Sequence, residues 1–295
     1  MSVSELIPAL AERGSRQAPE RLIGALLIQA GKLKPEDVER ILQHQREKGG
    51  RFGDVGKELE LLTAADIEFA LARQFDFPYL RPGESNVSEE IVAAYDPFCP
   101  QAEVLRGLRS ELSLRWFDRD GASRALAVIS GTRGEGRSYL AANLAVVFAQ
   151  LGASTLLIDA DLRNPRQHRL FGLEERAGLS AVLSERAGTE TVQRVASLPR
   201  LSVLPAGTQP PNPLELLARP VFAELLGHLA TKVDVILLDS PAAAESADAQ
   251  TIGVRAGAAL IVVRKNSAHK WRVQGTFESV TQAKITVVGA VLNDF

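Results

Sequence analysis

The sequence predicts an α/β fold, in which a parallel sheet carries helices on both faces and a small, mainly helical domain precedes it. Three observations support this prediction. From about residue 102, short apolar runs rich in β-branched residues alternate with stretches of helical periodicity. A glycine-rich stretch follows the first of these runs, and the first 80 residues contain a helical pattern that occurs twice. Apolar strands separated by helices are typical of parallel sheets that are covered on both faces.

The helical domain, residues 1–80, uses one unit twice at an offset of 29 residues. Gly24 and Gln45 of the first unit correspond to Gly53 and Gln74 of the second. Each unit has apolar residues at helical spacing and a helix start in its middle. These starts are Lys34-Pro35-Glu36-Asp37 and Thr63-Ala64-Ala65-Asp66. We expect two helix–turn–helix units that cover each other's apolar faces.

Residues 81–101 are predicted to be a linker between this domain and a second domain over residues 102–295. The segment is rich in turn residues, and it breaks both the helical and the strand period. A short helix is expected within it at residues 88–94.

The second domain is predicted to contain six strands and at least three long helices. The spacing predicts strands at residues 125–130, 154–158, 201–205, 233–239, 257–264 and 284–292. It predicts helices at residues 138–151, 213–231 and 270–283. Ligands of such sheets bind at the carboxyl ends of the strands, so we expect the site there.

The composition excludes several classes of protein. A net charge of −2 provides no basic field for nucleic acid, so no nucleic-acid partner is expected. The single cysteine, Cys99, excludes an internal disulfide and a cysteine-based zinc site. No apolar run reaches the roughly 18 residues of a membrane span, and the first residues do not have the form of a signal peptide. We expect a cytoplasmic protein that reaches a membrane only through a partner.

The glycine-rich stretch has the form of a phosphate-binding loop, G-x-x-x-x-G-K-[ST], with arginine in the lysine position. It follows the first predicted strand and precedes a predicted helix, so backbone N–H groups and the helix N-terminus would surround phosphate oxygens. We therefore expect ATP with Mg²⁺ as cofactors, with Arg137 reaching the outer phosphates and Ser138 holding the metal. The expected nucleotide-binding residues are Gly131, Thr132, Arg133, Gly134, Glu135, Gly136, Arg137, Ser138 and Tyr139.

Three aspartates end predicted strands beside this loop. Asp159 and Asp161 follow one apolar run, and Asp239 follows another. Phosphoryl transfer needs Mg²⁺ and a carboxylate that orients or deprotonates the nucleophile. We expect Arg137 and the three aspartates to be catalytic, and Ser138, Asp159 and Asp239 to hold the metal.

Together, these motifs resemble the cytoplasmic domain of bacterial tyrosine kinases (BY-kinases) that accompany polysaccharide chain-length determinants. The resemblance covers roughly residues 100–295. The matching motifs are Ser130-x-x-Arg133-Gly134-Glu135-Gly136-Arg137-Ser138, Asp159-x-Asp161-x-Arg163 and Asp239-Ser240-Pro241-Ala242. The resemblance implies a tyrosine autokinase or ATPase in exopolysaccharide biosynthesis and chain-length control or export. It also implies a membrane-embedded, Wzz-like chain-length determinant as partner.

A charged motif upstream also matches this family. Glu103, Arg106 and Arg109 lie on one third of a predicted helix, and apolar residues lie on the opposite face. We expect the helix to dock by its apolar face and to present these charges outward. In the family, this motif joins neighbouring subunits in a ring, so the resemblance implies an oligomer interface at these three residues.

The N-terminal repeat resembles the MshEN domain of type II secretion and type IV pilus assembly ATPases. Some members bind cyclic di-GMP through paired R-L-G-x-x-L-x-x-x-G-x-L…Q motifs. The second repeat keeps Arg51 and Gly53 but has Glu60 in place of a glycine, and the first has Leu22 in place of the arginine. The resemblance implies either a cyclic di-GMP site or a helical docking module.

Two features conflict with ordinary tyrosine autophosphorylation. The chain has three tyrosines and no tyrosine cluster at its end, and arginine replaces the loop lysine. A non-catalytic nucleotide-binding adaptor therefore remains an alternative. A MinD/ParA-like switch ATPase is a second alternative, although the lysine that follows the first loop glycine in those proteins is Thr132 here.

Overall fold

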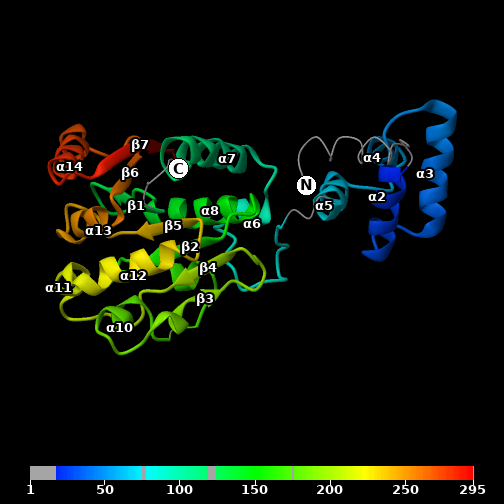
Figure 1. Cartoon of the computed structure of the whole chain (residues 1–295). Helices are drawn as coiled ribbons and strands as arrows, with labels where there is room; N and C mark the ends of the chain where they lie inside the picture. Colours follow the sequence, from blue (N-terminus) through cyan, green and yellow to red (C-terminus); the bar gives the residue numbers. More distant parts are fainter. Residues whose placement is uncertain (1–17, 75–77, 119–123, 175, 295) are drawn as a thin grey trace, which may run out of the picture. The chain divides into compact units, whose positions relative to one another are not determined.

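A computed structural model describes residues 18–74, 78–118, 124–174 and 176–294 (Figure 1). The chain forms two compact units, Met1–Pro78 and Tyr79–Phe295. The boundary lies within two residues of the predicted end of the helical domain. None of the described helices is long and apolar enough to cross a lipid bilayer.

The first unit is a structural repeat as well as a sequence repeat. A Cβ atom on Gly24 would lie 3.1 Å from the Val38 side chain, and one on Gly53 would lie 3.0 Å from the Ile67 side chain. Gly53 follows Gly24 by 29 residues, and Ile67 follows Val38 by the same number. The close approach of two helices therefore explains why both positions are glycine. The helices of this unit are α2 (Ala18–Gln29), α3 (Pro35–Lys48), α4 (Phe52–Glu58) and α5 (Ala64–Gln74).

The turns inside the two repeats are equivalent too. Lys34 N–H donates to Asp37 Oδ2 at 3.2 Å, and Thr63 N–H donates to Asp66 Oδ2 at 3.1 Å, so both second helices begin with the same cap. An ion pair between Lys32 and Asp66 (3.0 Å) joins the two turns. Fully buried side chains fill the centre of the unit, among them Leu27, Ile41 and Phe52.

Residues 81–101 are part of the second unit, and the prediction of a linker there is corrected. Ala93 N–H donates to the buried Asn143 side chain at 2.9 Å, and the Ala93 and Ala94 side chains are fully buried in the core of this unit. The sequence did not predict this packing, because turn residues break its periodicity without preventing the burial of nearby side chains.

The second unit contains a seven-stranded sheet with the order β3-β4-β2-β5-β1-β6-β7. All neighbouring strands pair in parallel except β3, which pairs with β4 in antiparallel fashion. The six predicted strands are confirmed within two residues at each end. The strands are β1 (Ala125–Ser130), β2 (Thr155–Asp159), β3 (Gln193–Arg194), β4 (Leu201–Leu204), β5 (Val235–Asp239), β6 (Ala258–Arg264) and β7 (Thr286–Asn293).

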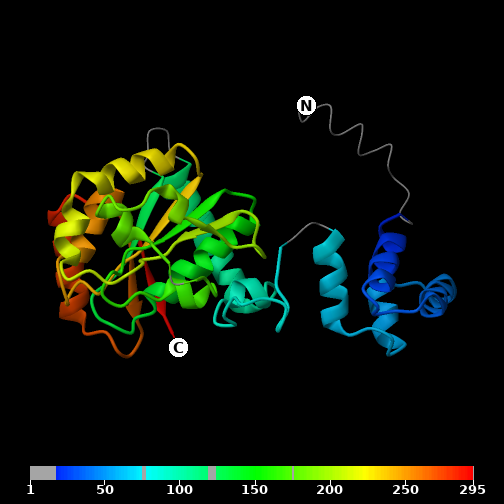
Figure 2. The same ribbon diagram turned by 90° about the horizontal axis from the view of Figure 1, so that it is seen from below.

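Helices cover both faces of the sheet, as predicted (Figures 1 and 2). Leu126 and Val128 of β1 point to the face that carries α6, α7 and α8, whereas Ala127 and Ile129 point to the face that carries α10 to α13. This alternation is the period of two expected of a strand buried on both faces.

The predicted helix at 213–231 is two helices in the structure. Pro220 lacks a backbone N–H and disfavours helical geometry at Arg219, whose ψ is 146°. The sequence did not predict α9, α10, α13 or β3. The helices of this unit are α6 (Val92–Tyr95), α7 (Pro100–Leu112), η1 (Ser113–Phe117), α8 (Arg137–Gln150), α9 (Gln167–Leu170), α10 (Leu179–Leu183), η2 (Thr189–Thr191), α11 (Pro213–Ala218), α12 (Pro220–Ala230), α13 (Asp248–Ala256) and α14 (Lys270–Gln282).

Candidate functional site

The predicted phosphate-binding loop connects the end of β1 to the start of α8. Gly134 and Gly136 have φ angles of 80° and 94°. Residues that carry a Cβ rarely adopt such angles, so these two glycines are needed for the turn. The Glu135 side chain is buried and accepts a hydrogen bond from Thr132 N–H at 2.8 Å. The loop is thus held in shape from within, and α8 presents its N-terminus beside it.

A basic residue in the lysine position is expected to extend outward from the loop. Arg137 does not. Its side chain is 8% exposed. Nε donates to Ser240 O at 2.8 Å, and Nη1 donates to Thr132 O at 2.8 Å and to Ser130 Oγ. A guanidinium has five donors in a planar fork, so it can donate to several separated oxygens at once. The ammonium group of a lysine is a compact charge and cannot span such oxygens in the same way.

Two of the predicted aspartates lie next to each other. Asp159 ends β2 and Asp239 ends β5, and the parallel register of these strands pairs them directly. Both are completely buried. In each, one oxygen, Oδ1, has no hydrogen-bond partner among the described residues. The other oxygen of Asp159, Oδ2, accepts hydrogen bonds from Arg166 N–H and Gln167 N–H, both at 2.9 Å.

Burial and proximity raise the pKa of both carboxyls. Burial is the larger cause for Asp159, and the neighbouring Asp239 adds to it, so its pKa lies well above the usual range. Burial raises the pKa of Asp239 from 3.8 to about 6. The Ser138 hydroxyl and the Gln167 amide act on Asp239 in the opposite direction. The structure therefore concentrates negative charge at the point where the loop, β2 and β5 meet.

This arrangement fits a magnesium ion. Mg²⁺ prefers oxygen ligands, and each buried aspartate offers a carboxylate oxygen without a partner in the described part of the chain. Within the described ranges, no group of three or more His, Cys, Asp or Glu residues is placed to hold a metal. Ser138, which interacts with Asp239, supplies a further oxygen. Magnesium usually completes its coordination with water and phosphate oxygens.

Gln167 is a site residue that the sequence did not predict. Its buried amide donates to Asp239 Oδ2 at 2.8 Å and to Ser138 O at 3.1 Å. It therefore holds the aspartate and the loop helix together. No local motif marks it in the sequence.

Comparison with known proteins identifies the family. A family model described as "ParA: NUBPL iron-transfer P-loop NTPase" matches residues 121–294, more than half of the chain. The tyrosine-protein kinase YwqD of Bacillus subtilis is 34% identical over 209 residues, which are 71% of this chain and 87% of YwqD. The chain belongs to the bacterial tyrosine-protein kinases. Their catalytic domain is of the ParA-like P-loop type.

Two further relatives show how far the similarity extends. The putative tyrosine-protein kinase EpsB of Ralstonia solanacearum is 34% identical over 69% of this chain, which spans 27% of EpsB. The kinase domain of the Escherichia coli tyrosine kinase ETK superposes with a TM-score of 0.66 at 29% identity, covering 69% of this chain and 79% of that domain. The matched family region lies within the second unit, so the MshEN resemblance of the first stays a prediction.

Asp161, the third predicted aspartate of this kinase-family chain, is engaged by the backbone. Its Oδ1 accepts from Arg163 N–H at 3.1 Å and from Asn164 N–H at 2.9 Å, which shapes the turn after β2. Arg163 in turn forms a two-point ion pair with the fully buried Asp248 at 2.7 and 3.2 Å. Asp161 therefore has a structural role, and its predicted catalytic role is untested.

None of the three tyrosines of this kinase-family chain is exposed. Tyr79, Tyr95 and Tyr139 are all half-buried. Tyr95 OH donates to Val87 O, and burial raises the pKa of Tyr139, which lies in the first turn of α8. No tyrosine of the chain is thus presented as an acceptor in this structure.

The orientation of α7 about its own axis differs from the predicted one. Arg109 Nη1 donates to Val147 O of α8 at 3.1 Å, so this arginine points toward the core and not outward. Val104, expected on the docked face, is 73% exposed. The buried face is centred on Ala102, Leu105 and Leu112, which rotates the helix relative to the prediction. Glu103 and Arg106 form an ion pair at 2.8 Å near the surface.

Proposed function

We propose that the chain binds ATP with Mg²⁺ and transfers the γ-phosphoryl group to a tyrosine of another polypeptide. The pair of buried aspartates, each with an unpartnered oxygen beside a phosphate-binding loop, carries this proposal. Phosphoryl transfer is catalysed mainly by positioning and by stabilising charge, and this site supplies both. The half-buried tyrosines favour an acceptor outside the chain.

The loop amides and the α8 N-terminus would hold the phosphates, and Ser138 with Asp239 would hold the metal. Bound Mg²⁺ neutralises charge on the phosphate oxygens. Asp159, whose pKa is raised, suits the acceptance of a proton from the tyrosine hydroxyl. The bond from the γ-phosphorus to the bridging oxygen of ADP breaks, a bond to the tyrosine oxygen forms, and the proton moves to Asp159.

Arg137 would slow this reaction. Its guanidinium is bound to three protein oxygens, so it must leave them before it can contact a phosphate. A positive charge remains in the loop, which preserves attraction for the nucleotide, while the position of the charge differs from that of a lysine. We propose that the site binds ATP well and turns it over slowly.

Transfer of ³²P from γ-labelled ATP separates this proposal from its alternatives. The full chain would be incubated with Mg²⁺ and a tyrosine-containing copolymer, and label on tyrosine would be compared with free phosphate. Transfer supports the kinase. Free phosphate alone supports a MinD/ParA-like switch, and nucleotide binding without either product supports a non-catalytic adaptor.

A role in exopolysaccharide biosynthesis, chain-length control or export would follow from the BY-kinase resemblance. The chain spans most of YwqD but about a quarter of EpsB, which indicates that it corresponds to a catalytic portion. We infer that a membrane-embedded, Wzz-like chain-length determinant binds this chain at the cytoplasmic face of the membrane. Co-purification of the tagged chain with such a protein, and polymer length in a deletion strain, test this inference.

The N-terminal unit would be a docking module. Its paired helical repeats form a separate core, and the cyclic di-GMP motifs are incomplete in both repeats. Cyclic di-GMP is the alternative ligand of this unit. Equilibrium binding of cyclic di-GMP to the full chain at concentrations up to about 100 μM separates the two, since a signalling ligand binds far more tightly than this.

A further inference from the structure

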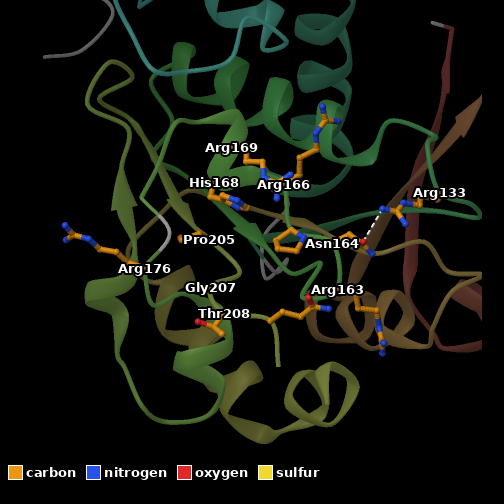
Figure 3. Close-up of a pocket in the computed structure, with 12 residues that line it drawn as sticks. Arg133, Arg163, Asn164, Arg166, His168, Arg169, Arg176, Pro205, Gly207 and Thr208 are labelled. Carbon is orange, nitrogen blue, oxygen red and sulfur yellow. Dashed lines mark hydrogen bonds between the residues drawn. The ribbon is translucent and has the colours of Figure 1, made fainter. Parts of the chain in front are cut away.

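A strongly basic pocket lies beside the phosphate-binding loop. It has a volume of about 600 Å³, and five arginines line it: Arg133, Arg163, Arg166, Arg169 and Arg176. Among the residues that the structure describes, no acidic residue lines it. Figure 3 shows that the pocket is formed by the loop after β1, the segment after β2 and the loop that follows β4.

The arginines are only partly neutralised by their surroundings. Arg163 pairs with Asp248 at 2.7 Å, Arg166 pairs with Glu90 at 2.6 Å, and Arg176 pairs with Glu174. Arg133 donates to the neutral Asn164 at 3.1 Å, and both it and Arg169 are exposed without an ion pair to any residue that the structure describes. The pocket thus retains positive charge that a negatively charged ligand would balance.

The charges are spread out and not gathered at one point. Arg133 and Arg176 stand at opposite sides of the pocket in Figure 3. A single compact anion would contact only part of this lining. An extended ligand with several negative charges would contact more of it, and arginine forks bind carboxylates at two points.

The position of the pocket suits the binding of the polypeptide that accepts the phosphoryl group. Arg133 belongs to the phosphate-binding loop, and Arg163 follows Asp161 at the end of β2. None of Ser138, Asp159 and Asp239 lines the pocket, so it adjoins the proposed phosphate and metal site without being part of it. A polypeptide lying in this pocket would have its side chains next to the proposed position of the γ-phosphate.

We propose that this pocket binds an acidic polypeptide segment and thereby selects tyrosines that are flanked by aspartate or glutamate. The proposal rests on the proposed function, because it names the acceptor of the phosphoryl transfer. The acceptor supplies the negative charges, and the arginines supply the matching donors. Basic segments are excluded by repulsion from the same arginines.

The test compares two labelled copolymers, poly(Glu,Tyr) and poly(Lys,Tyr), for binding to the full chain by fluorescence anisotropy at 0.15 M salt. Poly(Glu,Tyr) is expected to bind and poly(Lys,Tyr) is not. In the double variant Arg169→Gln/Arg176→Gln, Kd for poly(Glu,Tyr) is expected to rise about tenfold, since each exposed charge contact contributes modestly. Kd of the wild type is also expected to rise with salt.

Arg200→Gln is the matched control. Arg200 is exposed and precedes β4, at the opposite end of the strand from the pocket, and its substitution is expected to change Kd by less than about twofold. An equal effect of Arg200→Gln, or no effect of the double variant, would overturn the proposal. Thermal melting of each variant checks that it is folded.

Three further measurements keep this proposal separate from the proposed function. Binding of a fluorescent ATP analogue to the wild type tests the nucleotide site alone. If nucleotide binds and poly(Glu,Tyr) does not, the acceptor proposal fails while the proposed function stands. If polyphosphate binds and poly(Glu,Tyr) does not, the pocket takes a phosphorylated polymer instead, and the proposal is overturned. Where transfer is measurable, the double variant is expected to raise KM for poly(Glu,Tyr) and to leave kcat unchanged.

Discussion

At the scale of single residues, Arg137 is the feature that distinguishes this site. The sequence showed that an arginine stands in the lysine position of the loop, but not where its guanidinium lies. In the structure it binds Ser240 O, Thr132 O and Ser130 Oγ inside the loop. The nucleotide therefore competes with the protein for this charge, and the loop retains its shape through Glu135.

We expect Arg137→Lys to raise ATP turnover. A lysine would be released from the Ser240 contact and would place a compact charge near the phosphates, and misplacement by about 1 Å costs on the order of 100-fold in rate. Phosphate release and ³²P transfer measure the gain. Arg200→Lys, at an exposed position away from the site, is the control and is expected to have no effect. An unchanged rate in Arg137→Lys would show that the arginine is not the limiting feature.

The buried aspartates predict a pH-dependent stability. Because the pKa of Asp239 is raised from 3.8 to about 6 in the folded state, stability falls as pH rises through this range. Asp239→Asn removes the charge and is expected to increase the free energy of unfolding at pH 8 by on the order of 2 kcal/mol. At pH 3.5 the gain should vanish, since the carboxyl is then protonated in both states.

Urea unfolding at the two pH values measures this effect, and Asp96→Asn, at an exposed position, is the control. The same Asp239→Asn variant is expected to lose Mg²⁺-dependent nucleotide binding, because it removes a proposed metal ligand. A variant that is destabilised at pH 8, or that binds Mg²⁺–nucleotide normally, would contradict this account of the site.

At the scale of elements, the segment before α7 shows how a turn-rich stretch can belong to a core. Ala93 and Ala94 of α6 are completely buried, and Asn143 of α8 accepts the Ala93 N–H. The Asn143 amide also donates to Tyr139 O at 3.0 Å. One buried polar side chain therefore joins α6 to the helix that begins at the phosphate-binding loop.

We expect Asn143→Ala to destabilise the second unit by about 1–3 kcal/mol, because it leaves a buried N–H without an acceptor. Hydrogen exchange should increase at residues 88–96, and urea unfolding gives the magnitude. Gln274→Ala on α14 is a control, since Gln274 is exposed and its side chain bonds only to Glu278 in the described structure. Unchanged exchange at residues 88–96 would mean that packing alone holds this segment.

At the scale of the whole molecule, self-association stays a prediction, and the structure shows how the three residues of the expected interface are held. The resemblance implies an interface at Glu103, Arg106 and Arg109, and Arg109, which is partly buried, donates to Val147 O of α8. Glu103 remains available at the surface, with its side chain 72% exposed. Arg106 is partly held by Glu103 and by Pro97 O.

We expect Glu103→Arg to prevent the formation of a ring. It reverses a charge that a neighbouring subunit would contact, and like charges across an interface are unfavourable. Light scattering with Mg²⁺ and ATP measures the mass of the assembly. Glu111→Arg is the matched control, because Glu111 lies on the same helix and is similarly paired, with Arg115 at 2.8 Å. Equal loss of assembly in both variants would remove the special role of Glu103.

Local patterns along the chain predict the α/β class, the six parallel strands, the repeat of the first unit and the position of the loop. Periodicity and glycine spacing are local properties, so they can be read along the chain. These patterns also place Asp159 and Asp239 at strand ends, because apolar strands stop where a charge appears.

The way in which these residues meet depends on how the chain folds. The register of β2 and β5 places Asp159 beside Asp239, and burial in the folded chain raises the pKa of both. Contacts between distant parts of the chain hold the Arg137 side chain inside the loop, give Gln167 its role and pack residues 81–101 onto the second unit. The same is true of the basic pocket, whose lining residues come from three segments that the sheet brings together. Long-range contacts of this kind leave no periodic pattern in a single sequence.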